Sequence, residues 1–234
     1  MKFLAALLAG LLLGAASFGA VLLYNPLTSD RGLSPLSVSD AELITLNFSA
    51  VPSESIVYTN DGESLHEPTP GKVLQLWEAP IRQTSAMVTV MRDGRNRVAG
   101  LGVKLSSKSE STRLLHGEAI VDSVWYLYLP EHGSLFLQQS ENYWRFIRDV
   151  AFPAWRSSAN SWRGNWLGDL TAGPGALGTA AVSGGSGRVA GLEMAGVESL
   201  LVRAFSADTG LVSADGRLII EFPEYEDVAA TAQP

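Results

Sequence analysis

The residues best suited to chemistry lie on one strand-like segment, Val121–Leu129, in which polar, aliphatic and aromatic side chains alternate. A strand has a side-chain period of two, so the segment has two faces. One face carries Asp122, Val124, Tyr126 and Tyr128, and the other carries Ser123, Trp125, Leu127 and Leu129.

Two arrangements of this strand remain open. If the Asp122 face lines a closed interior, burial would raise the pKa of its carboxyl, which could then act as a general acid. If Trp125 packs the core instead, which is the more usual arrangement, Asp122 is solvated. We take Asp122 as the candidate catalytic residue and Trp125, Tyr126 and Tyr128 as candidate ligand-binding residues.

Arg203 is a further ligand-binding candidate, on the segment Glu198–Phe205. Alternation places it on the same face as Leu201 and Phe205. An inward Arg203 could orient the acidic head group of a ligand, whereas an outward one would be solvated, as arginines usually are.

The sequence predicts no metal and no cofactor. The three histidines, His66, His116 and His132, are not spaced as metal ligands, and there is no cysteine to supply a thiolate. The segment Gly173–Gly178 matches G-x-G-x-x-G, but a predicted strand follows where dinucleotide binding needs a helix.

Most of the elements expected around these residues are strands. Their signals are β-prone runs bounded by turn residues: Ala86–Met91, Arg97–Leu105, Gly117–Leu129, Ser134–Gln138, Thr179–Ser183, Val189–Leu192, Glu198–Phe205 and Arg217–Phe222. Two short helices are also expected. One covers Ser39–Phe48, after a capping box, and the other begins near Ser140 and ends at Pro153. This pattern predicts a mainly β chain, either an antiparallel barrel or a sandwich.

A glycine-rich run favours the barrel. Val182–Val202 reads VSGGSGRVAGLEMAGVESLLV, and Gly184, Gly185, Ser186 and Gly187 form a turn between two predicted strands. This run resembles the signature of the allene oxide cyclase and dirigent barrels, and of the bacterial proteins with an allene-oxide-cyclase-like domain. The resemblance covers about twenty of the 234 residues. It implies an eight-stranded antiparallel barrel around an apolar cavity, which binds a small hydrophobic ligand without a cofactor, and a possible homo-oligomer.

The N-terminal segment predicts the location of the protein in the cell. Residues 3–24 are uncharged and, as a helix, span roughly 33 Å, enough to cross a bilayer core. With Lys2 on the short side, the chain would be a single-pass inner-membrane protein whose C-terminal domain lies in the periplasm. The alternative is a signal peptide cleaved after Ser17, which gives a secreted or periplasmic protein.

The rest of the chain divides into a tether at 25–38, a barrel domain at 39–223 with a helical, Trp-rich insertion at about 140–166, and a disordered tail at 224–234. Since Lys2 is the only charged residue before Asp30, this part has 24 acidic and 16 basic residues, a net charge near −8. Such a charge disfavours nucleic acid as a partner.

Three functions remain open. The leading hypothesis is a membrane-tethered barrel that binds a small apolar molecule of the lipid or isoprenoid class. The second is a cofactor-free isomerase or cyclase, which would need an inward acid or base. The third is a non-catalytic envelope protein, with a filled barrel and a Trp-rich face that meets a protein partner.

Overall fold

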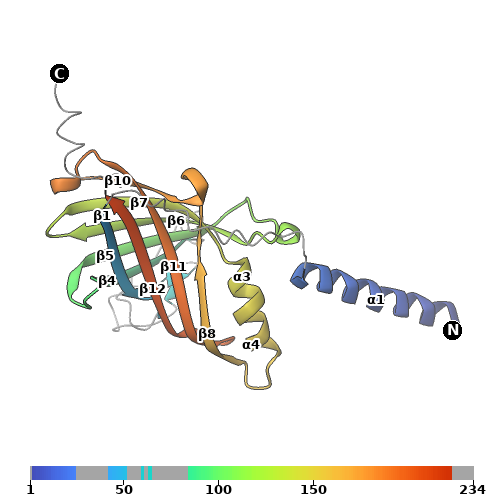
Figure 1. Cartoon of the computed structure of the whole chain (residues 1–234). Coiled ribbons are helices and arrows are strands. Elements are labelled where there is room, and N and C mark those ends of the chain that lie inside the picture. The colour runs from blue at the N-terminus through green and yellow to red at the C-terminus, as the bar shows by residue number, and fades with distance from the viewer. Residues whose placement is uncertain (1, 25–41, 52–58, 61–62, 65–83, 223–234) are drawn as a thin grey trace.

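The computed structural model describes residues 2–24, 42–51, 59–60, 63–64 and 84–222. The predicted tether at 25–38 and the tail at 224–234 lie outside the described residues. Figure 1 shows a barrel of strands, one side of which carries the helices α3 and α4.

The helices are α1 (Lys2–Tyr24), α3 (Trp144–Phe146) and α4 (Phe152–Arg156), and a π-helical turn, Ile147–Ala151, joins the last two. The strands are β1 (Glu42–Ser49), β2 (Thr59–Asn60), β3 (Glu63–Ser64), β4 (Thr84–Arg92), β5 (Val98–Lys108), β6 (Ile120–Leu129), β7 (Gly133–Asn142), β8 (Ser161–Asp169), β9 (Thr171–Gly173), β10 (Ala180–Gly184), β11 (Glu193–Ser206) and β12 (Gly210–Phe222).

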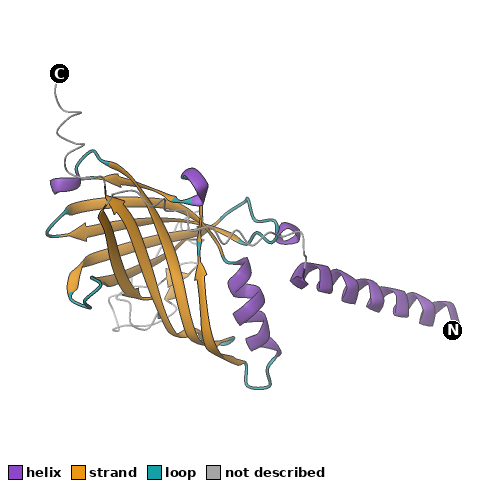
Figure 2. Ribbon diagram, in the orientation of Figure 1, coloured by secondary structure: helices purple, strands orange, loops and turns teal. Residues whose placement is uncertain are grey.

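Eight antiparallel strands close into a barrel, as the sequence predicts. The ring runs β10, β11, β12, β1, β4, β5, β6, β7, and β10 then pairs with β7 to complete it. Closure leaves no free edge in the ring, so an antiparallel sheet of this size is protected from pairing with another chain. Beyond β10, the same edges of β11 and β7 pair with β8 and β9. Figure 2 shows the strands in orange and the helices in purple.

The predicted helix over Ser39–Phe48 is wrong, because this segment contains the strand β1. All eight residues of β1 pair with β12, from Glu42 opposite Phe222 to Ser49 opposite Asp215. Leu46 and Phe48, two residues apart, are buried in the core. The capping-box pattern is a local signal, and pairing along a whole strand outweighs it.

The Gly184–Gly187 turn lies between β10 and β11 and helps to close the barrel. Ser186 Oγ lies 2.7 Å from Ser134 Oγ, and the Gly185 amide donates to the Ser134 carbonyl at 2.8 Å. A Cβ on Gly133 would stand 1.9 Å from the Ser186 carbonyl oxygen, and Gly133 has a φ of +117°. Only glycine fits at this contact between the turn and the β6–β7 hairpin. The predicted strand Val189–Leu192 is wrong, since a 3-10 helix, Gly187–Val189, ends at its first residue and β11 begins only at Glu193.

The predicted helix near Ser140 begins later and ends later than expected. β7 continues to Asn142, so Ser140 is a strand residue and the helix starts at Trp144. Pro153 does not end it, because a proline in the first turn of α4 needs no backbone N–H there.

The buried apolar side chains of the described residues form two clusters. The first consists of inward residues of the ring, with Phe48 and Trp125 in an edge-to-face contact at 4.8 Å. The second places Val150 of the helical segment against Trp166, Leu200 and Val202. The helix therefore covers one part of the barrel.

α1 contains a stretch, Lys2–Val21, that is long and apolar enough to cross a membrane. A membrane anchor and a signal sequence share these properties, so the helix fits either.

Candidate functional site: a buried charge cluster

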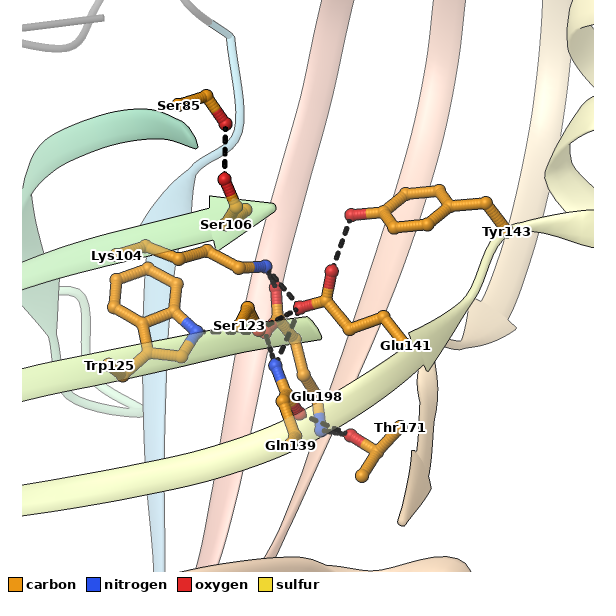
Figure 3. A network of polar contacts seen from close by, with 10 residues as sticks. All are labelled: Ser85, Lys104, Ser106, Ser123, Trp125, Gln139, Glu141, Tyr143, Thr171 and Glu198. Carbon is orange, nitrogen blue, oxygen red and sulfur yellow. Dashed lines mark hydrogen bonds and ion pairs between the residues drawn. The ribbon is translucent and has the colours of Figure 1, made fainter. Parts of the chain in front are cut away.

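Three charged side chains meet inside the barrel, and they come from three different strands. Lys104 lies on β5, Glu141 on β7 and Glu198 on β11, and all three are buried. Figure 3 shows their head groups converging on one point. Charged residues are almost never buried to this extent unless they are paired, so this cluster is the strongest candidate site.

Lys104 joins the two carboxylates. Its ammonium group donates to Glu198 Oε1 at 2.8 Å and also forms an ion pair with Glu141 Oε1. The same Nζ lies 5.4 Å from the ring centroid of Trp125. Two carboxylates therefore share a single cation in a setting from which water is largely excluded.

Glu141 is the better-satisfied carboxylate. Besides Lys104, its Oε1 accepts from Ser123 Oγ at 2.9 Å and from Gln139 Nε2 at 2.6 Å. Its Oε2 accepts from the Tyr143 hydroxyl at 2.9 Å. Four donors thus surround one carboxylate, which favours its ionised form.

Glu198 has fewer donors. Its Oε2 accepts from the indole N–H of Trp125 at 2.8 Å and from Gln139 Nε2, and its Oε1 accepts from Lys104. Gln139 therefore bridges the two carboxylates with one amide group.

The fold shifts the pKa values of the two carboxyls in opposite directions. Burial, the largest effect, raises the pKa of Glu198 to about 7, and the nearby Glu141 charge adds to it. Burial would also raise the pKa of Glu141, but Lys104 and the hydrogen bonds outweigh it and hold that pKa below its usual value. At neutral pH the cluster therefore gains or loses one proton, at Glu198.

The chemistry available is proton transfer. Burial acts to lower the pKa of Lys104, but the two carboxylates outweigh it and raise that pKa above its usual value. Lys104 stays an ammonium group at neutral pH, so it donates hydrogen bonds and does not act as a nucleophile. A carboxyl with a pKa near the working pH is suited to act as a general acid or base.

Apolar side chains enclose the cluster. Along β11 the inward row places Glu198 between Gly196 and Leu200, and Leu200 belongs to the second apolar cluster. On β6, Ser123 lies two residues before Trp125, which is fully buried and belongs to the first apolar cluster. The charge cluster and its polar partners therefore lie next to both apolar clusters.

The structure places the sequence-predicted candidates on both sides of the barrel wall. Trp125 is inside and touches the cluster, as the second arrangement of its strand requires. Tyr126 and Tyr128 are on the outer face and exposed. Arg203 is also exposed and forms an ion pair with Asp215, because it follows the inward residue Val202 and lies on the outer face of β11.

Asp122 lies on the outer face as well, since β6 turns the Trp125 face inward. It accepts a hydrogen bond from Ser140 at 2.7 Å. Its side chain lines a surface hollow of about 240 Å³, whose other lining residues are Thr84, Leu105, Ser106, Ser107, Ser123, Val124, Gln138, Gln139, Ser140 and Pro174. Asp122 therefore does not face the barrel interior that its catalytic hypothesis required.

Sequence reasoning missed Lys104, Glu141 and Glu198. A signal was available on β11, because the alternation that puts Arg203 on one face puts Glu198 on the other, with Leu200 and Val202. A carboxylate in an otherwise apolar row is unusual and would have indicated a buried site.

No family model matches the sequence, and no curated protein matches it. Among solved structures, the chain is similar to a nonspecific heme-binding cyclase that catalyses a [4 + 2] cycloaddition during neoabyssomicin biosynthesis. The two are 11% identical with a TM-score of 0.38, over 82% of this chain and 76% of the other.

Within the part of the chain that the structure describes, no group of three or more His, Asp or Glu residues is placed to hold a metal ion.

Proposed function

We propose that this protein is a small-molecule-binding β-barrel that carries out acid–base chemistry without a cofactor, as a cofactor-free isomerase or cyclase does. The observation that carries this proposal is the buried cluster of Lys104, Glu141 and Glu198. It supplies the inward acid or base that the sequence-based hypothesis required, in residues other than Asp122.

A core with only a structural role would be at least as stable without buried charges. Replacing a buried ion pair or triad by apolar side chains of similar volume is often neutral or stabilising by about 1–4 kcal/mol. The neighbouring inward positions of the barrel, such as Leu127 and Leu137, are apolar and fully buried. A barrel of this kind could fold with an apolar middle layer, so the charged one supports a chemical role.

The apolar surroundings of Glu198 support an apolar substrate. We infer a small molecule of the lipid or isoprenoid class, and we infer that α1 holds the barrel at the membrane in which such molecules reside. In this role Glu198 would exchange a proton with the substrate while Lys104 and Trp125 stabilise negative charge nearby. Membership of the allene-oxide-cyclase-like or dirigent-like barrels is part of the same proposal.

Solvent deuterium provides the test. Full-length protein in nanodiscs is incubated in D₂O with an apolar extract of the cells that produce it, and the extract is analysed by mass spectrometry. We expect a compound that gains deuterium or changes retention time with wild-type protein and does not with Glu198→Gln. Glu193→Gln, an exposed change on the same strand, is the matched control.

Two results would count against the proposal. If no compound changes, the barrel performs no proton transfer on such molecules. If Glu198→Gln and wild type act alike, the chemistry does not use the cluster. Binding without any deuterium uptake would leave the simpler carrier, the leading hypothesis from the sequence.

A further inference from the structure

We propose that Gln139 and Thr171 are positioning residues that hold one amide NH₂ group against both carboxylates of the cluster and so favour the charged forms of Glu141 and Glu198. This inference rests on the proposed function, because it concerns the same acid–base site. Its basis is the set of hydrogen bonds that surround the two carboxylates (Figure 3).

Gln139 lies between the two carboxylates and touches both. Its Nε2 donates to Glu141 Oε1 at 2.6 Å and to Glu198 Oε2. A primary amide has two N–H donors on one atom, so one Gln139 side chain can serve both carboxylates at once. In the reverse orientation its oxygen would face two carboxylates, which would repel it.

Thr171 fixes the amide in the productive orientation. The Thr171 hydroxyl donates to Gln139 Oε1 at 2.7 Å. The same hydroxyl oxygen accepts the backbone N–H of Glu198 at 2.7 Å. A single hydroxyl therefore ties the Gln139 side chain to the strand that carries Glu198.

Thr171 also lies where the barrel wall between β7 and β11 extends beyond the end of β10. β10 joins β7 to β11 only over its own length, opposite Leu135–Gln138 and Glu193–Gly196. Beyond this, the Leu170 amide donates to the Glu198 carbonyl and the Asn142 amide donates to the Leu170 carbonyl, both at 2.8 Å. Leu170 and Thr171 thus connect β7 to β11 at the level of the cluster.

The asymmetry between the carboxylates follows from their donors. Lys104 and Gln139 serve both, whereas Ser123 and Tyr143 serve only Glu141 and Trp125 serves only Glu198. If Gln139 turned away, each carboxylate would lose a donor that stabilises its charged form. A proton would then bind more tightly at both carboxyls.

The experiment is a pH titration of full-length protein in nanodiscs by NMR, with ¹³C at the glutamate side-chain carboxyls. Glu141→Gln and Glu198→Gln assign the two resonances. In wild type we expect the Glu198 resonance to titrate alone near neutral pH. In Thr171→Val we expect its midpoint to rise by about one pH unit, and the Glu141 resonance to shift with it. Thr171→Ser, which keeps the hydroxyl, should titrate like wild type.

Gln139→Leu provides a second test, should Thr171→Val fail to fold, and it should produce the same coupled titration. Gln138→Leu, on the outer face of the same strand, is its control. Unchanged titration in both Thr171→Val and Gln139→Leu would overturn the proposal, and so would loss of the wild-type behaviour in Thr171→Ser. The readout needs no substrate, so a negative deuterium experiment together with a shifted Thr171→Val titration would refute the proposed function alone.

Discussion

Glu198 is the residue that sets the behaviour of the site, because its charge depends on pH in the neutral range. The ordinary value for a glutamate carboxyl is 4.5, and burial raises the pKa of Glu198 to about 7 in the fold. The folded state therefore holds a proton that the unfolded state has lost between these two pH values. As a result, stability from this group is fully present below pH 4.5 and falls as the pH rises towards 7.

Glu198→Gln should remove this dependence on pH. A glutamine keeps the size of the side chain and cannot ionise, so the buried negative charge never forms. We expect wild type to lose on the order of 1–3 kcal/mol of unfolding free energy between pH 5 and pH 8, and the variant to lose much less. Urea denaturation at the two pH values measures this. An equal loss of unfolding free energy in wild type and Glu198→Gln would show that another group is responsible. As a control, Glu193→Gln should behave as wild type.

Lys104→Met should be strongly destabilising. It leaves two buried carboxyls without their cation, and breaking a buried pair in this way costs roughly 3–5 kcal/mol. The pKa of Glu141 would then rise, because Lys104 is the charge that holds it low. Thermal or urea unfolding measures the loss, with the exposed Lys108→Met on the same strand as control. A variant as stable as wild type would mean that the ion pairs do not form in solution.

At the scale of elements, strands with clear alternation and turns were predictable, and β1 was not. The hairpin of β4 and β5 and the strands β6, β7, β10, β11 and β12 are confirmed near their predicted positions. For β1, the capping box of Ser39 and Glu42 suggested a helix, although Ile44, Leu46 and Phe48 alternate as a strand requires. Long-range pairing with β12 decided between two local patterns.

The site was less predictable than the fold, for a geometric reason. Lys104 and Glu198 are 94 residues apart in the sequence, and only closure of the barrel brings them together. Alternation gives the face of each residue but not which strands are neighbours across the interior. The sequence therefore identified the Trp125 row and could not show which charges meet it.

Gly133→Ala tests how the glycine turn closes the barrel. The new Cβ would stand 1.9 Å from the Ser186 carbonyl oxygen, at a φ of +117°. We expect a loss of about 1–3 kcal/mol or more in unfolding free energy, since either the backbone or the turn must move. Gly94→Ala is the matched control, because a Cβ there meets no atom within 4 Å. Equal stability of the two variants would contradict the contact between the turn and the β6–β7 hairpin.

At the scale of the whole molecule, the chain combines an apolar N-terminal helix with a barrel that encloses a buried charge cluster. We expect α1 to be retained as an anchor. Intact-mass analysis of protein from the membrane fraction should then show the full N-terminus, and alkaline carbonate should not release it. A mature chain that starts at Phe18 would establish the cleaved signal peptide instead.

The proposed function depends on a carboxyl in the barrel interior that exchanges its proton near neutral pH. Infrared titration of the full chain in nanodiscs tests it directly, since a protonated carboxyl and a carboxylate absorb at different frequencies. We predict one buried carboxyl that loses its proton with a midpoint at about pH 7 in wild type. This signal should be absent in Glu198→Gln and present in Glu193→Gln. If no carboxyl titrates near neutral pH, or if the signal persists in Glu198→Gln, Glu198 is not the acid–base group.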